Sequence, residues 1–115
     1  MAWYAEQVRV GLARMMDGLR GLGVGFFPSH ANFVLMRIGA KHGELVKAMR
    51  ARGVLLRDRS ADPGCEGYVR ITVGVEEHVT RGLAALAESL KEIGWTAAES
   101  VFAPSGAAEG ERDYE

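Results

Sequence analysis

Three arginines in the second half of the chain, Arg57, Arg59 and Arg70, have a residue type and spacing suited to binding a small anion. Arg70 stands at the centre of the segment GYVRITVG, whose other residues favour a β-strand. Arg57 lies near the end of the segment VLLRD, residues 54–58. If these segments are neighbouring strands, two guanidinium groups lie along one edge of a sheet, and each can grip a carboxylate or phosphate through two parallel hydrogen bonds. The pattern therefore predicts an anion-binding site.

A second interpretation of Arg70 stays open on composition alone. Charged residues are common on the open face of a sheet, where they face water. In that case Arg70 would pair loosely with Asp58 or Glu66, a contact worth about 0–1 kcal/mol.

Hydrophobic periodicity predicts the elements that would position these arginines. Apolar residues at spacings of three and four indicate an amphipathic helix from Ala2 to about Leu22, which glycines then end. The nearly continuous apolar run NFVLMRI, residues 32–38, predicts a central strand covered on both faces. The remaining expected elements are a helix over 41–52, a strand over 54–58, a loop over 59–66, a strand over 67–74 and a helix over 76–93.

Alternation within the last strand assigns its side chains to two faces. One face would carry Val69, Ile71 and Val73, and the other Tyr68, Arg70 and Thr72. The apolar set is suited to a core and the polar set to a ligand, so Arg70 is expected on the side of the sheet away from the helices.

These elements give the order α-β-α-β-β-α and an α/β (α+β) fold. We expect a small two-layer domain over residues 1–94, with helices on one face of a three-stranded sheet and the other face left for something else. Residues 95–115 are small, polar and acidic, and are predicted to form a disordered tail.

Composition limits the classes of function. The chain has 115 residues and a net charge of −1, which suits one domain and gives no reason to expect binding to nucleic acid or to a membrane. Cys65 is its one cysteine and the start of the chain lacks a secretory pattern, so the cytoplasm is the expected compartment. The histidines His30, His42 and His78 have no partners at ligand spacing, so no zinc site is expected.

Four segments of the chain resemble a known family in that family's order: FFPSHANFVLMRI, AMRARGVLLRDRS, GYVRITVGVEEH and the closing amphipathic helix. They are similar to the C-terminal small domain of fold-type I, pyridoxal-phosphate-dependent aminotransferases, and most similar to the histidinol-phosphate aminotransferases. The resemblance covers about residues 3–93. It implies a small domain whose open sheet face looks toward a larger, cofactor-binding domain.

The resemblance also implies roles for individual residues. Arg70 matches the family arginine that grips the α-carboxylate of the substrate, and Arg57 matches an arginine that contributes to binding the substrate phosphate. Asn32 matches an asparagine that ties down the loop near the domain junction, although a structural turn cap is an equally good interpretation of it.

The same resemblance implies that part of the enzyme lies outside this chain. The family uses a lysine in its large domain to bind pyridoxal 5'-phosphate. The lysines here, Lys41, Lys47 and Lys91, fall at polar positions of predicted helices and are expected to be solvated. We therefore expect the cofactor in the complete enzyme, no cofactor bound to this chain alone, and no transamination by this chain alone.

The expected partners are the missing large domain and a phosphorylated, amino-acid-like substrate. Without that domain, the aromatic side chains of Trp3, Tyr4, Phe26 and Phe27 would be partly bare, which favours a homo-oligomer. Two alternatives stay open: an enzyme similar to threonine-phosphate decarboxylase, and a stand-alone, non-catalytic module that binds an anion or a protein. The sequence also leaves open whether the chain is a truncated product, half of a split enzyme or an expressed fragment.

Overall fold

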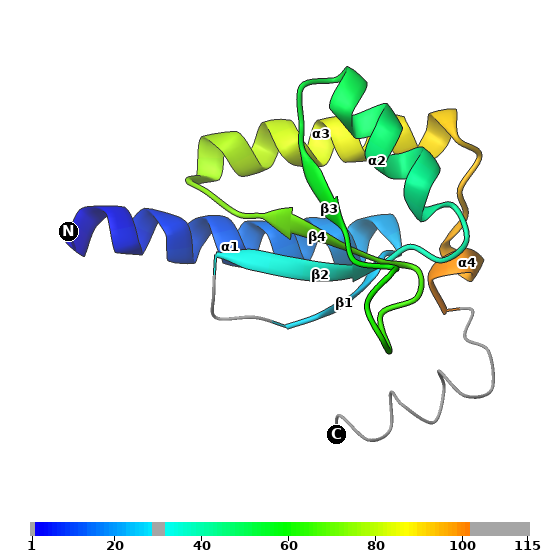
Figure 1. Ribbon diagram of the computed structural model, residues 1–115. Helices are drawn as coiled ribbons and strands as arrows, with labels where there is room; N and C mark the ends of the chain where they lie inside the picture. The colour runs from blue at the N-terminus through cyan, green and yellow to red at the C-terminus, as the bar shows by residue number, and fades with distance from the viewer. Residues whose placement is uncertain (1, 29–31, 102–115) are drawn as a thin grey trace.

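Four antiparallel strands form one sheet in the order β1-β2-β4-β3, and three long helices cover one of its faces (Figure 1). The structure is a computed structural model and describes residues 2–28 and 32–101. The elements are α1 (Ala2–Leu22), β1 (Gly25–Phe27), β2 (Phe33–Arg37), α2 (His42–Ala51), β3 (Leu56–Asp58), β4 (Tyr68–Thr72), α3 (Glu76–Glu92) and α4 (Ala97–Val101).

Alternation in the two central strands separates the core from the open face. Val34 and Met36 of β2, and Val69 and Ile71 of β4, are buried beneath the helices. Their neighbours along each strand point to the opposite face. The two faces of β4 are therefore divided as its sequence predicts.

Strand register sets a row of side chains across the open face. Leu35 of β2 is paired with Phe27 of β1 and with Arg70 of β4, and Arg70 is paired in turn with Arg57 of β3. Cross-strand partners share a face of a sheet. Phe27, Leu35, Arg70 and Arg57 therefore form one row that crosses all four strands.

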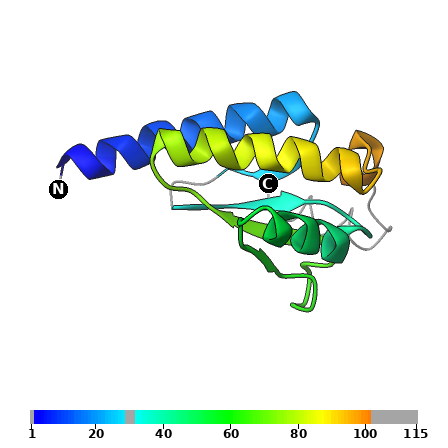
Figure 2. The same cartoon turned by 90° about the horizontal axis from the view of Figure 1, so that it is seen from above.

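The helices pack through apolar stripes, and α1 lies alongside α3 (Figure 2). Two glycines of α1 allow this close approach. A side chain at Gly11 would overlap the carbonyl oxygen of Gly74, and one at Gly18 would overlap the side chain of Leu83. Since Gly74 lies between β4 and α3, the helix pair holds the end of the strand that carries Arg70.

The sheet has one strand more than the three predicted. The additional strand, β1, occupies Gly25–Phe27, where the sequence had indicated only glycines that end the first helix. Gly23 adopts a positive φ of 78°, and the N–H of Val24 donates to the carbonyl of Leu19, so the chain reverses directly out of α1. Three residues carry too little pattern to indicate a strand, and pairing with β2 supplies its stability.

The chain is also folded beyond residue 94, where disorder had been predicted. Trp95 is buried, and its Nε1 donates to the carbonyl of Ile38 at 2.9 Å. In α4, the fully buried Ser100 hydroxyl accepts from the N–H of Gly25 and donates to the carbonyl of Arg37, both at 2.6 Å. Because Gly25 and Arg37 are register partners, this hydroxyl bridges the end of the β1–β2 ladder. The rest of the predicted tail, 102–115, lies outside the described residues.

None of the helices in the described ranges is long and apolar enough to cross a membrane.

We predict opposite effects for two glycine substitutions in α1. Gly11→Ala should lower the free energy of unfolding by about 1–3 kcal/mol, because the new methyl group overlaps the backbone at Gly74. Gly21→Ala is the matched control, since no atom lies within 4 Å of its added carbon, and it should raise the stability by about 0.5–1 kcal/mol. Urea unfolding followed by circular dichroism measures both. Equal effects would show that α1 does not pack as described.

We also predict that Ser100→Ala lowers the free energy of unfolding by about 1–3 kcal/mol, because it removes the hydroxyl that bonds a part-buried N–H and a part-buried carbonyl. Ala98→Ser, an exposed change in the same helix, should stay within about 0.5 kcal/mol of the parent chain. The same urea titration applies. A Ser100→Ala chain as stable as the parent would mean that α4 does not secure the sheet.

Candidate anion-binding site

Arg70 lies at the centre of the open face, in the middle of β4, with strands paired on both sides. Its guanidinium carbon lies 4.9 Å from the centroid of the Phe33 ring, within the range of a cation–π contact. The half-buried side chain is thus held by an aromatic ring rather than by a carboxylate. Such a contact fixes the position of the cation and leaves its hydrogen-bond donors available.

The donors of Arg70 lack acceptors within the described part of the chain. Its Nε is inaccessible to solvent and has no hydrogen-bond partner there, and no ion pair joins Arg70 to any described acid. A buried donor without an acceptor costs about 1–3 kcal/mol. The site therefore favours a ligand that brings acceptor oxygens to this guanidinium.

The acids closest to Arg70 in sequence do not neutralise it. Asp58 accepts from the N–H of Ser60 at 2.9 Å and lies 2.7 Å from Nδ1 of His42, so both of its oxygens have other partners. The alternative that Arg70 pairs with Asp58 is therefore wrong. No ion pair with Glu66, the other acid considered, is formed among the described residues.

The other two predicted arginines differ from each other. Arg59 is neutralised by Asp62, with 2.6 Å between Nη2 and the carboxylate. Arg57 is exposed, and in the described ranges it forms no ion pair. It lies directly across from Arg70 in the strand register. Like charges opposite each other destabilise a strand pair, so an anion placed between them would relieve their repulsion.

A second cluster on the same face was not found from the sequence. Arg37 donates through Nε to the Tyr68 hydroxyl at 2.8 Å, and the Tyr68 ring stacks on Phe27 with 5.5 Å between centroids. Arg37 and Tyr68 are register partners. The available signal was a charged residue near the end of the apolar run NFVLMRI, the same signal that singled out Arg70 in its strand.

Asn32 lies where β2 begins. Its carbonyl accepts from the N–H of Val73 at 2.7 Å, which extends the pairing of β2 with β4 by one residue, and its side chain is exposed. The structure thus brings Arg57 and Arg70 together and places Asn32 at the end of the same strand pair. The hydrogen bond of Asn32 is a main-chain contact, which any residue type could make.

The lysines do not fit the requirement of a pyridoxal phosphate site. Lys41 is half-buried, not simply solvated as predicted, because its Nζ donates to the carbonyl of Gly94 at 3.0 Å and lies 3.3 Å from Glu99. Lys47 and Lys91 are exposed on α2 and α3. A Schiff base needs a lysine that faces a bound cofactor, and two cavities formed by described residues have no lysine in their walls.

Comparisons with known proteins agree with this geometry. The family model for aminotransferase class I and II matches residues 1–86. A histidinol-phosphate aminotransferase of Desulfotalea psychrophila is 36% identical over 87 residues, and one of Symbiobacterium thermophilum is 38% identical over 84 residues; these matches cover 76% and 73% of this chain. A crystal structure of a Burkholderia pseudomallei protein assigned as an aminotransferase superposes with a TM-score of 0.64 at 37% identity, over 72% of this chain.

The matched region is a small part of each relative. It covers 23% of each of the two enzymes and 25% of the crystallised chain. The resemblance in sequence extends through β4, the strand that carries Arg70, and into α3. The chain therefore belongs to the class I and II aminotransferase family.

Proposed function

We propose that this chain supplies the substrate-binding arginines of a pyridoxal-phosphate-dependent aminotransferase that acts on histidinol phosphate in histidine biosynthesis, in the cytoplasm. The observation that carries the proposal is the Arg70 guanidinium, which has no ion pair with a described residue, is fixed against Phe33 and lies directly across from Arg57. The names of the relatives support the choice of reaction.

The arginine pair suits both substrates of such a reaction. Glutamate presents an α-carboxylate beside its amine, and histidinol phosphate presents a phosphate ester on the carbon that corresponds to that carboxylate. A carboxylate can be held by Arg70 alone through two parallel hydrogen bonds. A phosphate has a third oxygen and a second negative charge, which the exposed Arg57 can reach from the neighbouring strand.

The value of this pair lies in orientation. A substrate that is fixed at its anionic end presents its amine in one direction. The amine then meets the reacting group in a defined geometry. In the complete enzyme the amine would point away from the sheet, toward the large domain. That domain would supply the lysine and the cofactor. The cofactor would carry the amino group after the first substrate has left and before the second substrate accepts it.

The rest of the open face is suited to meeting that domain. Phe27, Phe33 and Leu35 are half-buried apolar side chains on the face opposite the three long helices of the described residues. A face that combines aromatic residues with arginine resembles the composition of protein interfaces. We therefore propose the large domain as the principal partner of this chain.

A chimera tests the proposal. The part of the Desulfotalea psychrophila enzyme that precedes the matched region would be joined to the whole of this chain, residues 1–115, so that Trp95 and α4 are kept. We expect amino transfer from histidinol phosphate to 2-oxoglutarate. Arg70→Ala should lower kcat/KM by about 30-fold to 1000-fold for both substrates, because the anion loses its main partner. Arg57→Ala should raise KM about tenfold for histidinol phosphate and much less for 2-oxoglutarate.

Arg70→Lys is the matched control, since it keeps the charge and loses the planar fork, and its rate should fall between those of the parent and Arg70→Ala. A folded, cofactor-loaded chimera whose activity is unchanged by Arg70→Ala would contradict the assigned role. Release of carbon dioxide from threonine phosphate, without amino transfer, would point instead to the decarboxylase alternative. An inactive chimera, together with tight anion binding by the isolated chain, would point to the stand-alone module.

We further propose that the isolated chain self-associates through its open face. Half-buried apolar residues there, and Leu55 with 74% of its surface exposed at the sheet edge, leave apolar area in water. We expect light scattering to give the mass of a dimer or a higher oligomer, and Leu35→Lys to weaken association by about tenfold or more. A monomer at high concentration would contradict this expectation.

A further inference from the structure

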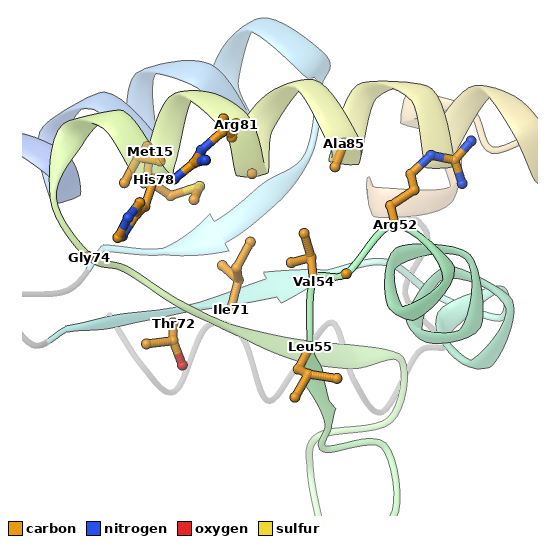
Figure 3. A pocket seen from close by; sticks show the side chains of 13 residues that line it. Met15, Arg52, Val54, Leu55, Ile71, Thr72, Gly74, His78, Arg81 and Ala85 are labelled. Carbon is orange, nitrogen blue, oxygen red and sulfur yellow. The ribbon is translucent and has the colours of Figure 1, made fainter.

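Apart from the arginine pair on the open face, a cavity lies on the helix-covered side of the sheet, between α3 and the paired strands β3 and β4 (Figure 3). Its volume is about 430 Å³, within the usual range for small-molecule sites. The floor is apolar: Met15, Ile71 and Val79 are at most 2% exposed, and Val54 and Ala85 add to the walls. The cavity could thus shelter an apolar group from water.

Cationic and imidazole side chains surround this apolar floor. Arg52 is already paired, with Nη2 at 2.7 Å from Glu92 and Nε at 3.8 Å from Glu88. Arg81 and His78, both on α3, have no ion pair or side-chain hydrogen bond with any residue in the described ranges. Arg81 and His78 are exposed side chains at the rim of an apolar hollow, and their hydrogen-bond donors are open to a ligand.

Gly82 leaves the cavity open on the side of α3: it lines the cavity, and no atom lies within 4 Å of the position that a side-chain carbon would occupy there. Gly53 also lines the cavity, but its positive φ of 82° already accounts for glycine at the end of α2. Gly82 lies inside α3, where glycine is about 1 kcal/mol less favourable than alanine. No close contact with a described residue requires glycine at this position, and the missing side chain leaves space for a ligand.

We propose that this cavity binds a small amphipathic anion: a short aliphatic or aromatic body on the apolar floor, with a carboxylate or phosphate monoester held by Arg81 and His78. The site is separate from the arginine pair on the open face. Ile71 lines the cavity while its neighbour Arg70 points to the other side of the sheet. Both faces of β4 would then carry an anion-binding site, one facing outward and one beneath α3.

An NMR titration of the full 115-residue chain with hexanoate tests the proposal. We expect saturable shifts of the amides of Gly53, Gly74 and Gly82, which line the cavity, with a dissociation constant in the millimolar range. Hexanol has the same apolar body without the charge and should bind at least about fivefold more weakly. Hexyl phosphate should shift the same amides as hexanoate.

Variants assign the contacts. Arg81→Gln should weaken hexanoate about fivefold, whereas Arg50→Gln, an exposed arginine of α2 outside the cavity, should leave the affinity unchanged. Gly82→Leu should abolish the shifts by filling the hollow, with circular dichroism confirming the fold. If that variant unfolds, the comparison of Arg81→Gln with Arg50→Gln decides the question.

Three results would overturn the proposal: no saturable shifts at these glycines, hexanol binding as tightly as hexanoate, or equal affinities for the Arg81→Gln and Arg50→Gln variants. Shifts confined to β2 and β4 amides on the open face would report the arginine pair instead, and would count against a second site.

Discussion

The central position of β4 is the constraint on which the site depends. The strand is paired with β2 on one side and β3 on the other, and Val69 and Ile71 anchor it in the core. Because successive side chains of a strand point to opposite faces, Arg70 must lie on the open face. The apolar burial that stabilises the domain is therefore the same force that presents the guanidinium outward, and the Phe33 ring only completes its placement.

Local pairing of acids determines which arginines stay available. Asp58 is held by His42 and Ser60, and Arg59 is matched by Asp62, whereas Arg57 and Arg70 face each other across the strands without a described carboxylate. A sequence selected for stability alone would place an opposite charge in such a pair. A local conflict of this kind is expected where a protein binds a ligand.

Long, regular elements and the alternation of β4 could be predicted from the sequence, because their signals repeat every two or every three to four residues. The short elements could not. Gly25–Phe27 becomes a strand only through pairing with β2, and Ser100 reaches the same ladder from far along the chain. The prediction that Arg57 and Arg70 form a pair required their two strands to be neighbours, and the family resemblance supported that assumption. The stacking of Tyr68 on Phe27 depended on β1 and was therefore missed.

The two faces of the sheet differ in how fully their side chains are buried and their charges are paired within this chain. The helix-covered face has a core whose largest side chains are fully buried, and the proposed cavity lies at the edge of that core, beneath α3. Among the described residues, the open face combines a cation that has no ion pair with half-buried aromatic rings. The chain spans about a quarter of the length of its relatives. The core is thus packed by side chains of this chain, whereas the open face keeps an arginine whose charge no described residue matches.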